Sequence, residues 1–75
     1  MKVLIDIEGY ENPFEWDSEI GLKIQCTANK DDNKHYFYIT PFLQAFAVSN
    51  KEVETGQIRC ERCNTWAKYT LKKIH

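Results

Sequence analysis

Three cysteines and one internal histidine are the residues of this chain whose types and spacing could do chemistry. Cys60 and Cys63 form a C-x-x-C motif, and two thiolates at this spacing in a tight turn can face the same ion. Zn²⁺ takes four sulfur or nitrogen ligands in a tetrahedron. Cys26 and His35 can supply the other two, because they lie on either side of a predicted hairpin. The sequence therefore predicts a Cys₃His zinc site, with His75 as a poorer fourth ligand because chain ends fray.

The segment 58–71 combines a strand pattern, the C-x-x-C motif and a second strand pattern, and it resembles one knuckle of a zinc ribbon. A zinc ribbon usually repeats the C-x-x-C motif, whereas this chain has only Cys26 at the equivalent place. Two other interpretations stay open. The cysteines can be small buried apolar residues, as free cysteines often are. They can also have a redox role, although a thioredoxin-like C-x-x-C opens a helix and this one lies between strands.

Enzymatic chemistry has little support in the sequence. Ser18 and Ser49 are the only serines, and neither lies in a nucleophile motif of the G-x-S-x-G type. No glycine-rich phosphate loop is present. We therefore expect the chain not to be an enzyme.

Alternation of apolar and polar residues predicts several short strands. The predicted strands are 2–8, 22–28 and 35–40, followed by a strand that begins at residue 58 and a last strand over 66–72. Polar residues 29–34 close a hairpin, residues 10–18 read as an irregular loop, and residues 51–57 read as a connection. Thr40 is expected to cap the first free amides of a short helix, and proline is tolerated at the first helical position, which Pro41 would occupy. This helix is expected to end near Ser49. This order predicts an α+β fold, with a mainly antiparallel sheet of four or five strands and one helix.

Length limits the fold to one small domain over residues 1–75. At this size hydrophobic burial and ordering entropy nearly cancel, so a metal or another cross-link would help. An odd number of cysteines fits a reducing compartment better than a disulfide scaffold. No secretory signal or membrane span is evident, and we expect a cytoplasmic protein.

Charge is distributed unevenly, although the formal net charge is −1. Residues 1–20 hold one base and six acids, and residues 51–75 hold six bases and three acids. An acidic surface that also carries aromatic rings can dock on a basic site of a larger protein. The sequence thus predicts a non-catalytic inhibitor or adaptor. Its predicted contact residues are Glu11, Phe14, Glu15, Trp16, Asp17, Tyr36 and Tyr38.

The basic C-terminal hairpin offers a second interpretation, as a zinc-ribbon-like module that binds nucleic acid. Alternating aromatic and basic side chains can stack on bases and contact phosphates. The residues of this alternative are Arg59, Arg62, Trp66, Lys68 and Lys72. The net charge of −1 argues against strong non-specific binding. A homodimer is compatible with either interpretation.

Overall fold

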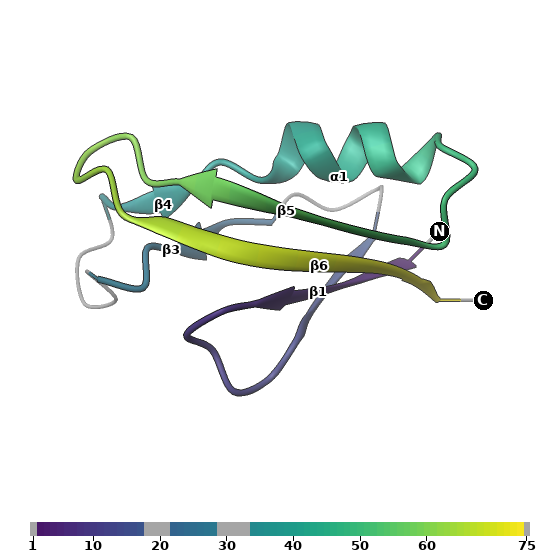
Figure 1. The fold of residues 1–75 in the computed structure, drawn as a ribbon, viewed down its shortest axis with the longest axis horizontal. Coiled ribbons are helices and arrows are strands. Elements are labelled where there is room, and N and C mark those ends of the chain that lie inside the picture. Colours follow the sequence, from purple (N-terminus) through teal and green to yellow (C-terminus); the bar gives the residue numbers. More distant parts are fainter. Residues whose placement is uncertain (1, 18–21, 29–33, 75) are drawn as a thin grey trace.

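An antiparallel sheet of four strands contains most of the regular structure (Figure 1). The structure is a computed structural model, and it describes residues 2–17, 22–28 and 34–74. Its strands follow the spatial order β2-β1-β6-β5, and a separate two-stranded sheet pairs β3 with β4. The elements are β1 (Lys2–Ile7), β2 (Phe14–Asp17), β3 (Ile24–Gln25), β4 (Tyr36–Phe37), α1 (Thr40–Ala47), β5 (Val53–Arg59) and β6 (Trp66–Ile74). The predicted α+β class is confirmed.

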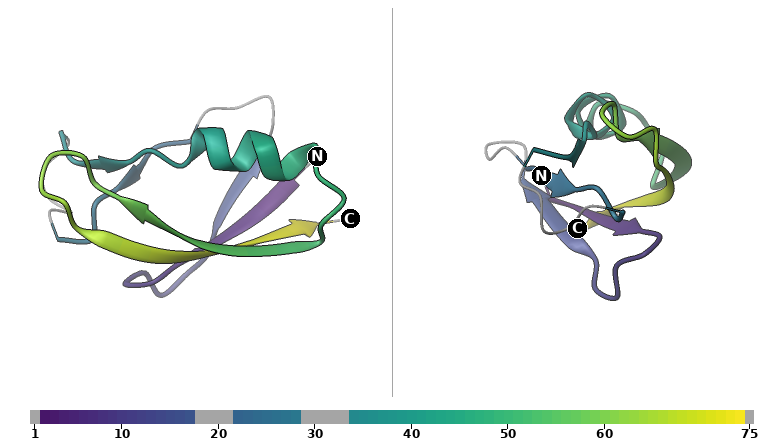
Figure 2. Two further views of the ribbon diagram at one scale, coloured as in Figure 1. Left: turned by 45° about the horizontal axis from the view of Figure 1, so that its top comes forward. Right: turned by 90° about the vertical axis from the view of Figure 1, so that its left-hand side faces the viewer.

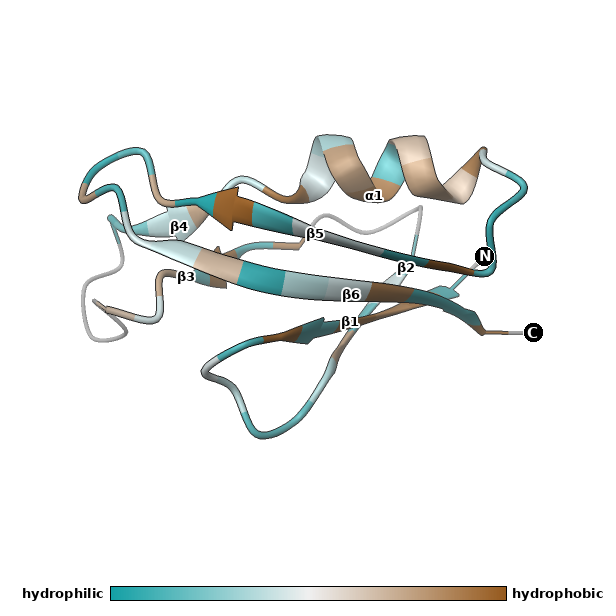
Figure 3. Cartoon of the chain, in the orientation of Figure 1, coloured by the Kyte–Doolittle hydropathy of each residue, from teal (hydrophilic) through white to brown (hydrophobic). Residues whose placement is uncertain are grey.

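The core lies between one face of the four-stranded sheet, α1 and the β3–β4 hairpin (Figure 2). Burial alternates along β6 from Trp66 to Lys72. The hydropathy bands of this strand include a hydrophobic band at Leu71 between more polar positions (Figure 3). The buried side chains of β6 are Ala67, Tyr69 and Leu71. The exposed side chains are Trp66, Lys68 and Lys72, on the outer face of the sheet. The predicted last strand is therefore confirmed, and it continues to Ile74.

Strand β2 occupies part of the segment that the sequence predicted to be an irregular loop, and that prediction is wrong. The register pairs Val3 with Trp16 and Ile5 with Phe14. Trp16 is consequently 3% exposed and belongs to the core. Pairing with β1 creates this strand, and the segment has no clear alternation of its own to reveal it. Trp16 must be removed from the predicted protein-contact residues, because its ring has no surface left to offer a partner.

Strand β5 begins at Val53, five residues earlier than expected. Its first half is polar and was predicted to be a connection. Seven consecutive pairs with β6 form it instead, from Val53 opposite Lys72 to Arg59 opposite Trp66. Gly56 suits this strand because the Tyr69 side chain crosses over it. A Cβ atom at Gly56 would lie 2.5 Å from the Tyr69 hydroxyl oxygen.

The β3–β4 hairpin is shorter than the predicted strands, since each of its strands has two residues. Of its predicted tip, residues 29–34, residues 29–33 lie outside the described residues. Helix α1 starts at Thr40 with Ile39 as the N-cap, and no side chain caps it. The expected cap of Thr40 is therefore wrong. The Thr40 hydroxyl instead donates a hydrogen bond of 3.4 Å to the Leu22 carbonyl.

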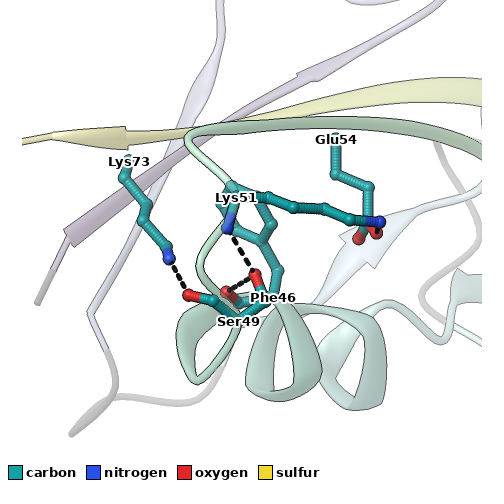
Figure 4. Close-up of polar contacts among 5 residues, drawn as sticks. All are labelled: Phe46, Ser49, Lys51, Glu54 and Lys73. Atoms are coloured by element: carbon teal, nitrogen blue, oxygen red, sulfur yellow. Dashed lines mark hydrogen bonds and ion pairs between the residues drawn. The ribbon is translucent and has the colours of Figure 1, made fainter.

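The C-terminal end of α1 is fastened to the end of β6 (Figure 4). The Ser49 hydroxyl donates to the Phe46 carbonyl at 2.7 Å, and the Lys73 ammonium group donates to the Ser49 carbonyl. The same ammonium nitrogen lies 5.1 Å from the centre of the Phe46 ring. Lys51 and Glu54 form an ion pair of 3.2 Å beside this junction.

No helix among the described residues is long and apolar enough to span a bilayer.

The two tryptophans provide a matched test of this core. Trp16→Ala removes a buried ring and should cost about 3–5 kcal/mol of unfolding free energy. Trp66 is 60% exposed, and Trp66→Ala should change the stability by about 0.5 kcal/mol or less. Urea denaturation followed by circular dichroism measures both. Equal stability of the two variants would contradict the placement of Trp16.

Candidate metal centre

Cys26 and His35 are brought opposite one another by the β3–β4 hairpin. Cys26 directly follows β3 and His35 directly precedes β4. The Cys26 backbone N–H donates to the His35 carbonyl at 3.0 Å, which extends the ladder by one pair beyond the assigned strands. Cys26 is fully buried, and His35 is half-buried. The hairpin therefore presents one sulfur and one imidazole on the side that faces the core.

Cys60 and Cys63 lie in the tight turn that connects β5 with β6. The Cys60 N–H donates to the Thr65 carbonyl at 2.9 Å, and the Asn64 N–H donates to the Cys60 carbonyl at 2.8 Å. Asn64 has a φ of 59°, in the left-handed region that asparagine tolerates better than most residues. The Arg59 guanidinium group also donates to the Asn64 side-chain oxygen at 3.2 Å. These contacts fold the C-x-x-C motif back on itself, as the sequence predicted.

The β3–β4 hairpin and the turn between β5 and β6 lie at the same end of the molecule, on the left in Figure 1. An isolated antiparallel bridge joins Phe37 of β4 to Cys60. The Arg62 guanidinium group adds a hydrogen bond of 3.4 Å to the Lys34 carbonyl. These contacts place the two hairpins side by side, although their sequences are more than 20 residues apart.

All four predicted ligand atoms gather where the hairpins meet. The three Sγ atoms and one imidazole nitrogen lie within 4.8 Å of one another. The Cys26 and Cys63 sulfurs are 3.5 Å apart, and the Cys60 sulfur is 3.5 Å from the His35 Nδ1 atom. A zinc tetrahedron with Zn–S bonds of 2.3 Å has S–S edges of about 3.8 Å and S–N edges slightly shorter. The donor set and its spacing therefore fit a tetrahedral metal ion.

The spacing also separates a metal centre from a disulfide. All three cysteines lie within the described residues, and all are free thiols. A disulfide would need sulfurs about 2.05 Å apart, well below the observed 3.5 Å. The inclusion of His35 in the cluster is expected for a metal site and has no role in a disulfide.

Local contacts shift the pKa values of the two cysteines of the turn, Cys60 and Cys63, in opposite directions. Burial raises the pKa of the Cys60 thiol, although the backbone N–H groups of Cys63 and Arg62 partly oppose this effect. The Thr65 hydroxyl lies 3.1 Å from the Cys63 sulfur. Together with the Thr65 N–H, it lowers the pKa of Cys63 to about 6. Backbone and hydroxyl donors that point at the sulfurs stabilise thiolates, which are the form that binds metal.

The other residues predicted to contact a protein or a nucleic acid differ in how far they are exposed. Glu11 and Glu15 are exposed, whereas Phe14 packs edge-on against Tyr10 with ring centres 5.0 Å apart. Asp17 and Tyr36 are half-buried. The predicted nucleic-acid residues are all exposed: Arg59, Arg62, Trp66, Lys68 and Lys72.

Sequence reasoning missed the supporting residues of the cluster and the exposure of Phe42, Val48 and Val53. Thr65 and Asn64 carry no recognisable signal, because their roles depend on how the turn closes. The large exposed apolar residues of the described chain are Tyr38, Phe42, Val48, Val53 and Trp66. Tyr38 is one of the predicted protein-contact residues and Trp66 is one of the predicted nucleic-acid residues, and all five lie on or beside α1, β5 and the start of β6.

The lowered pKa of Cys63 is one contribution to the pH dependence of metal binding, beside that of the Cys60 thiol, whose pKa is raised. As pH falls through about 6, protons compete for this thiolate, so metal affinity should decrease. Thr65→Val removes the hydroxyl, raises the Cys63 pKa and should move the loss of metal to higher pH. Competition with a chromophoric chelator between about pH 5 and 8 measures this shift. Thr70→Val, on β6 and distant from the cluster, is the control, and an equal shift in both variants would contradict the assignment.

No protein-family model, no curated protein and no solved structure that was compared with the chain matches it. The function is therefore argued from the geometry of the chain itself.

Proposed function

We propose that this chain is a non-catalytic protein-binding module held together by a structural Zn²⁺ ion. The observation that supports the metal is the convergence of Cys26, His35, Cys60 and Cys63. Three sulfurs and one imidazole nitrogen are a donor set typical of structural zinc sites. Catalytic zinc sites keep a coordination position open for water or substrate, whereas here the protein supplies all four ligands. The site accordingly favours a structural role.

A structural ion would stabilise the part of the fold that is weakest without it. Each strand of the β3–β4 hairpin has two residues, and an isolated hairpin is at best marginally stable in water. The ion would cross-link this hairpin to the β5–β6 turn. Structural zinc contributes about 10–16 kcal/mol of apparent binding free energy, which matches or exceeds the stability of a small domain.

Removal of the metal is the direct test. The purified protein should contain one zinc ion per chain by native mass spectrometry, and chelation should abolish its cooperative melting. Cys60→Ser and His35→Ala should have the same effect. His75→Ala replaces the only other histidine and should leave metal content and melting unchanged. Cobalt in place of zinc should give the visible absorption of a tetrahedral thiolate site.

Two results would contradict the zinc proposal. One is a cooperatively folded protein that contains no metal and does not take it up. The other is a loss of metal in His75→Ala with full retention in His35→Ala, which would assign the fourth ligand to the chain end.

Exposed apolar side chains support a protein as the partner. Tyr38 is 69% exposed and Trp66 is 60% exposed, and Phe42 is also exposed. Together with Pro41, Ile58 and Arg59 they line a hollow of about 360 Å³ between the start of α1 and the end of β5. Aromatic rings gathered around a concave surface are typical of protein interfaces. Glu11 and Glu15 remain exposed, so the acidic surface is available for the proposed inhibitor or adaptor contact as well.

One observation favours nucleic acid as a second candidate. A smaller hollow of about 210 Å³ beside the cluster is lined by Lys34, Tyr36, Tyr38, Glu61 and Arg62. Aromatic rings and cations in one hollow could stack on a base and contact its phosphate. Glu61 lies in the same hollow and would repel a phosphate, which makes this candidate the weaker one.

Capture from an extract of the cells that produce the chain distinguishes the three surfaces. We expect the immobilised protein to retain a protein partner after nuclease treatment, and Tyr38→Ala with Trp66→Ala should weaken capture at least about tenfold. Glu11→Gln with Glu15→Gln tests the acidic surface on the same fold. Loss of capture after nuclease would identify the nucleic-acid candidate. Capture that none of these changes affects would contradict the proposed function.

A further inference from the structure

No strand of the described residues pairs with the outer edge of β5. Strand order places β5 at the end of the sheet, with β6 on its inner side. Within the described residues the nearest pairing on the other side is the bridge between Phe37 and Cys60, just beyond the end of β5. An open edge presents a row of backbone donors and acceptors that can pair with another chain. Strands commonly protect such an edge with lysine, proline or short length, but β5 has seven residues and contains neither lysine nor proline.

The hydrogen-bond pattern shows which backbone groups of β5 point outward. Cys60 donates to Thr65 across the turn, and residues in an antiparallel ladder alternate in the direction of their N–H and C=O groups. The register from Val53 to Arg59 is unbroken. Ile58, Gly56 and Glu54 therefore pair with β6. The outward groups belong to the alternate residues Val53, Thr55, Gln57 and Arg59.

Helix α1 runs alongside β5 (Figures 1 and 2). Phe42 of α1 contacts the Tyr69 ring at 5.9 Å between ring centres, so the helix is anchored over β6. The hollow beside β5 is lined by the apolar side chains of Tyr38, Phe42 and Ile58 and also by Gln57, Arg59 and Glu61. A strand added to β5 would turn every second side chain toward this hollow, where an apolar side chain is favoured because Glu61 would repel an acidic one.

The outer face of the same edge is basic. Among the described residues, the outward-facing side chains of β5 and β6 include Arg59, Lys68 and Lys72 and no acid. None of these three cations forms an ion pair within the described part of the chain. The remaining side chains of an added strand would lie directly beside Arg59 and the polar side chains of β5, and Lys68 and Lys72 lie one strand further in, within reach of a long acidic side chain. Opposite charge at those positions is therefore favoured.

From these two faces we propose that β5 accepts an extended segment of the partner as a fifth strand of the sheet. The segment alternates acidic residues, which face Arg59, Lys68 and Lys72, with aromatic or large aliphatic residues, which enter the hollow beside α1. Backbone hydrogen bonds supply the common part of the affinity, and the alternation supplies the specificity. The inference rests on the proposed protein-binding function and names the chemistry of its partner.

A synthetic peptide of about eight residues that alternates Glu and Phe is a suitable probe for the intact chain. Amide hydrogen exchange measured by NMR should slow at Thr55 and Gln57, whose N–H groups point outward. Exchange at Gly56 and Ile58, which already pair with β6, should change less. A peptide that alternates Lys and Phe should bind at least about tenfold more weakly, because it places cations beside cations.

Two substitutions at one position separate the backbone from the side chain. Gln57→Pro removes the outward N–H without removing a bond to β6, and proline is tolerated at strand edges for this reason. It should weaken peptide binding at least about tenfold, whereas Gln57→Ala should bind as the native chain does. If Gln57→Pro fails to fold, Arg59→Glu with Lys68→Glu gives an independent test. That variant should reverse the preference between the two peptides, while Lys2→Glu on β1 should not.

Several results would overturn the strand-addition proposal. They are no binding of the Glu-Phe peptide up to about 1 mM, a folded Gln57→Pro variant that binds as well as Gln57→Ala, and single-stranded DNA in place of peptide as the ligand of this edge. A dimer that dissociates on Gln57→Pro would also overturn it, because a second copy would then occupy β5. Protein capture from extract that Gln57→Pro leaves unchanged would remove strand addition and retain the proposed function. If the native chain captures no protein from the extract, the proposed function itself is contradicted.

Discussion

The pairing of β6 with two neighbours is the interaction on which the rest of the structure depends. Strand β6 has nine residues, and its partners are β1 on one side and β5 on the other. Tyr69 on this strand contacts Phe42 of α1, and Lys73 near its end holds the last turn of the helix through Ser49. The start of β6 follows the turn that carries Cys60 and Cys63. The helix, the sheet and half of the ligand cluster are therefore all positioned by one strand.

The ligand set could be predicted from the sequence because few residue types can do this chemistry. Cys26, Cys60, Cys63 and His35 were the best candidates, and the structure brings these four together. Alternation along β1 and β6 was equally readable, because each strand has one buried and one exposed face. In such segments local sequence and tertiary structure agree.

Strand β2 and residues 53–57 of β5 could not be predicted, because their partners define them. Segment 53–57 is polar and contains Gly56, so no local pattern favours a strand until β6 lies beside it. Trp16 shows the same limit for burial. An aromatic ring between Glu15 and Asp17 looks exposed in sequence, yet its position opposite Val3 turns it into the core. Support of the cluster by Thr65 likewise depends on a turn that closes only in three dimensions.

The two halves of the outer sheet face carry opposite charge, and this has a consequence for how the molecule meets other molecules. Asp6, Glu15 and Asp17 lie with Lys2 on the half formed by β1 and β2, whereas Arg59, Lys68 and Lys72 lie on the half formed by β5 and β6. A chain with a net charge of −1 thus has an electric dipole across its sheet. Such a dipole orients an approaching charged surface before contact and speeds productive encounters. Salt weakens this orientation, since the Debye length is about 8 Å at physiological ionic strength and the torque acts mainly at close range.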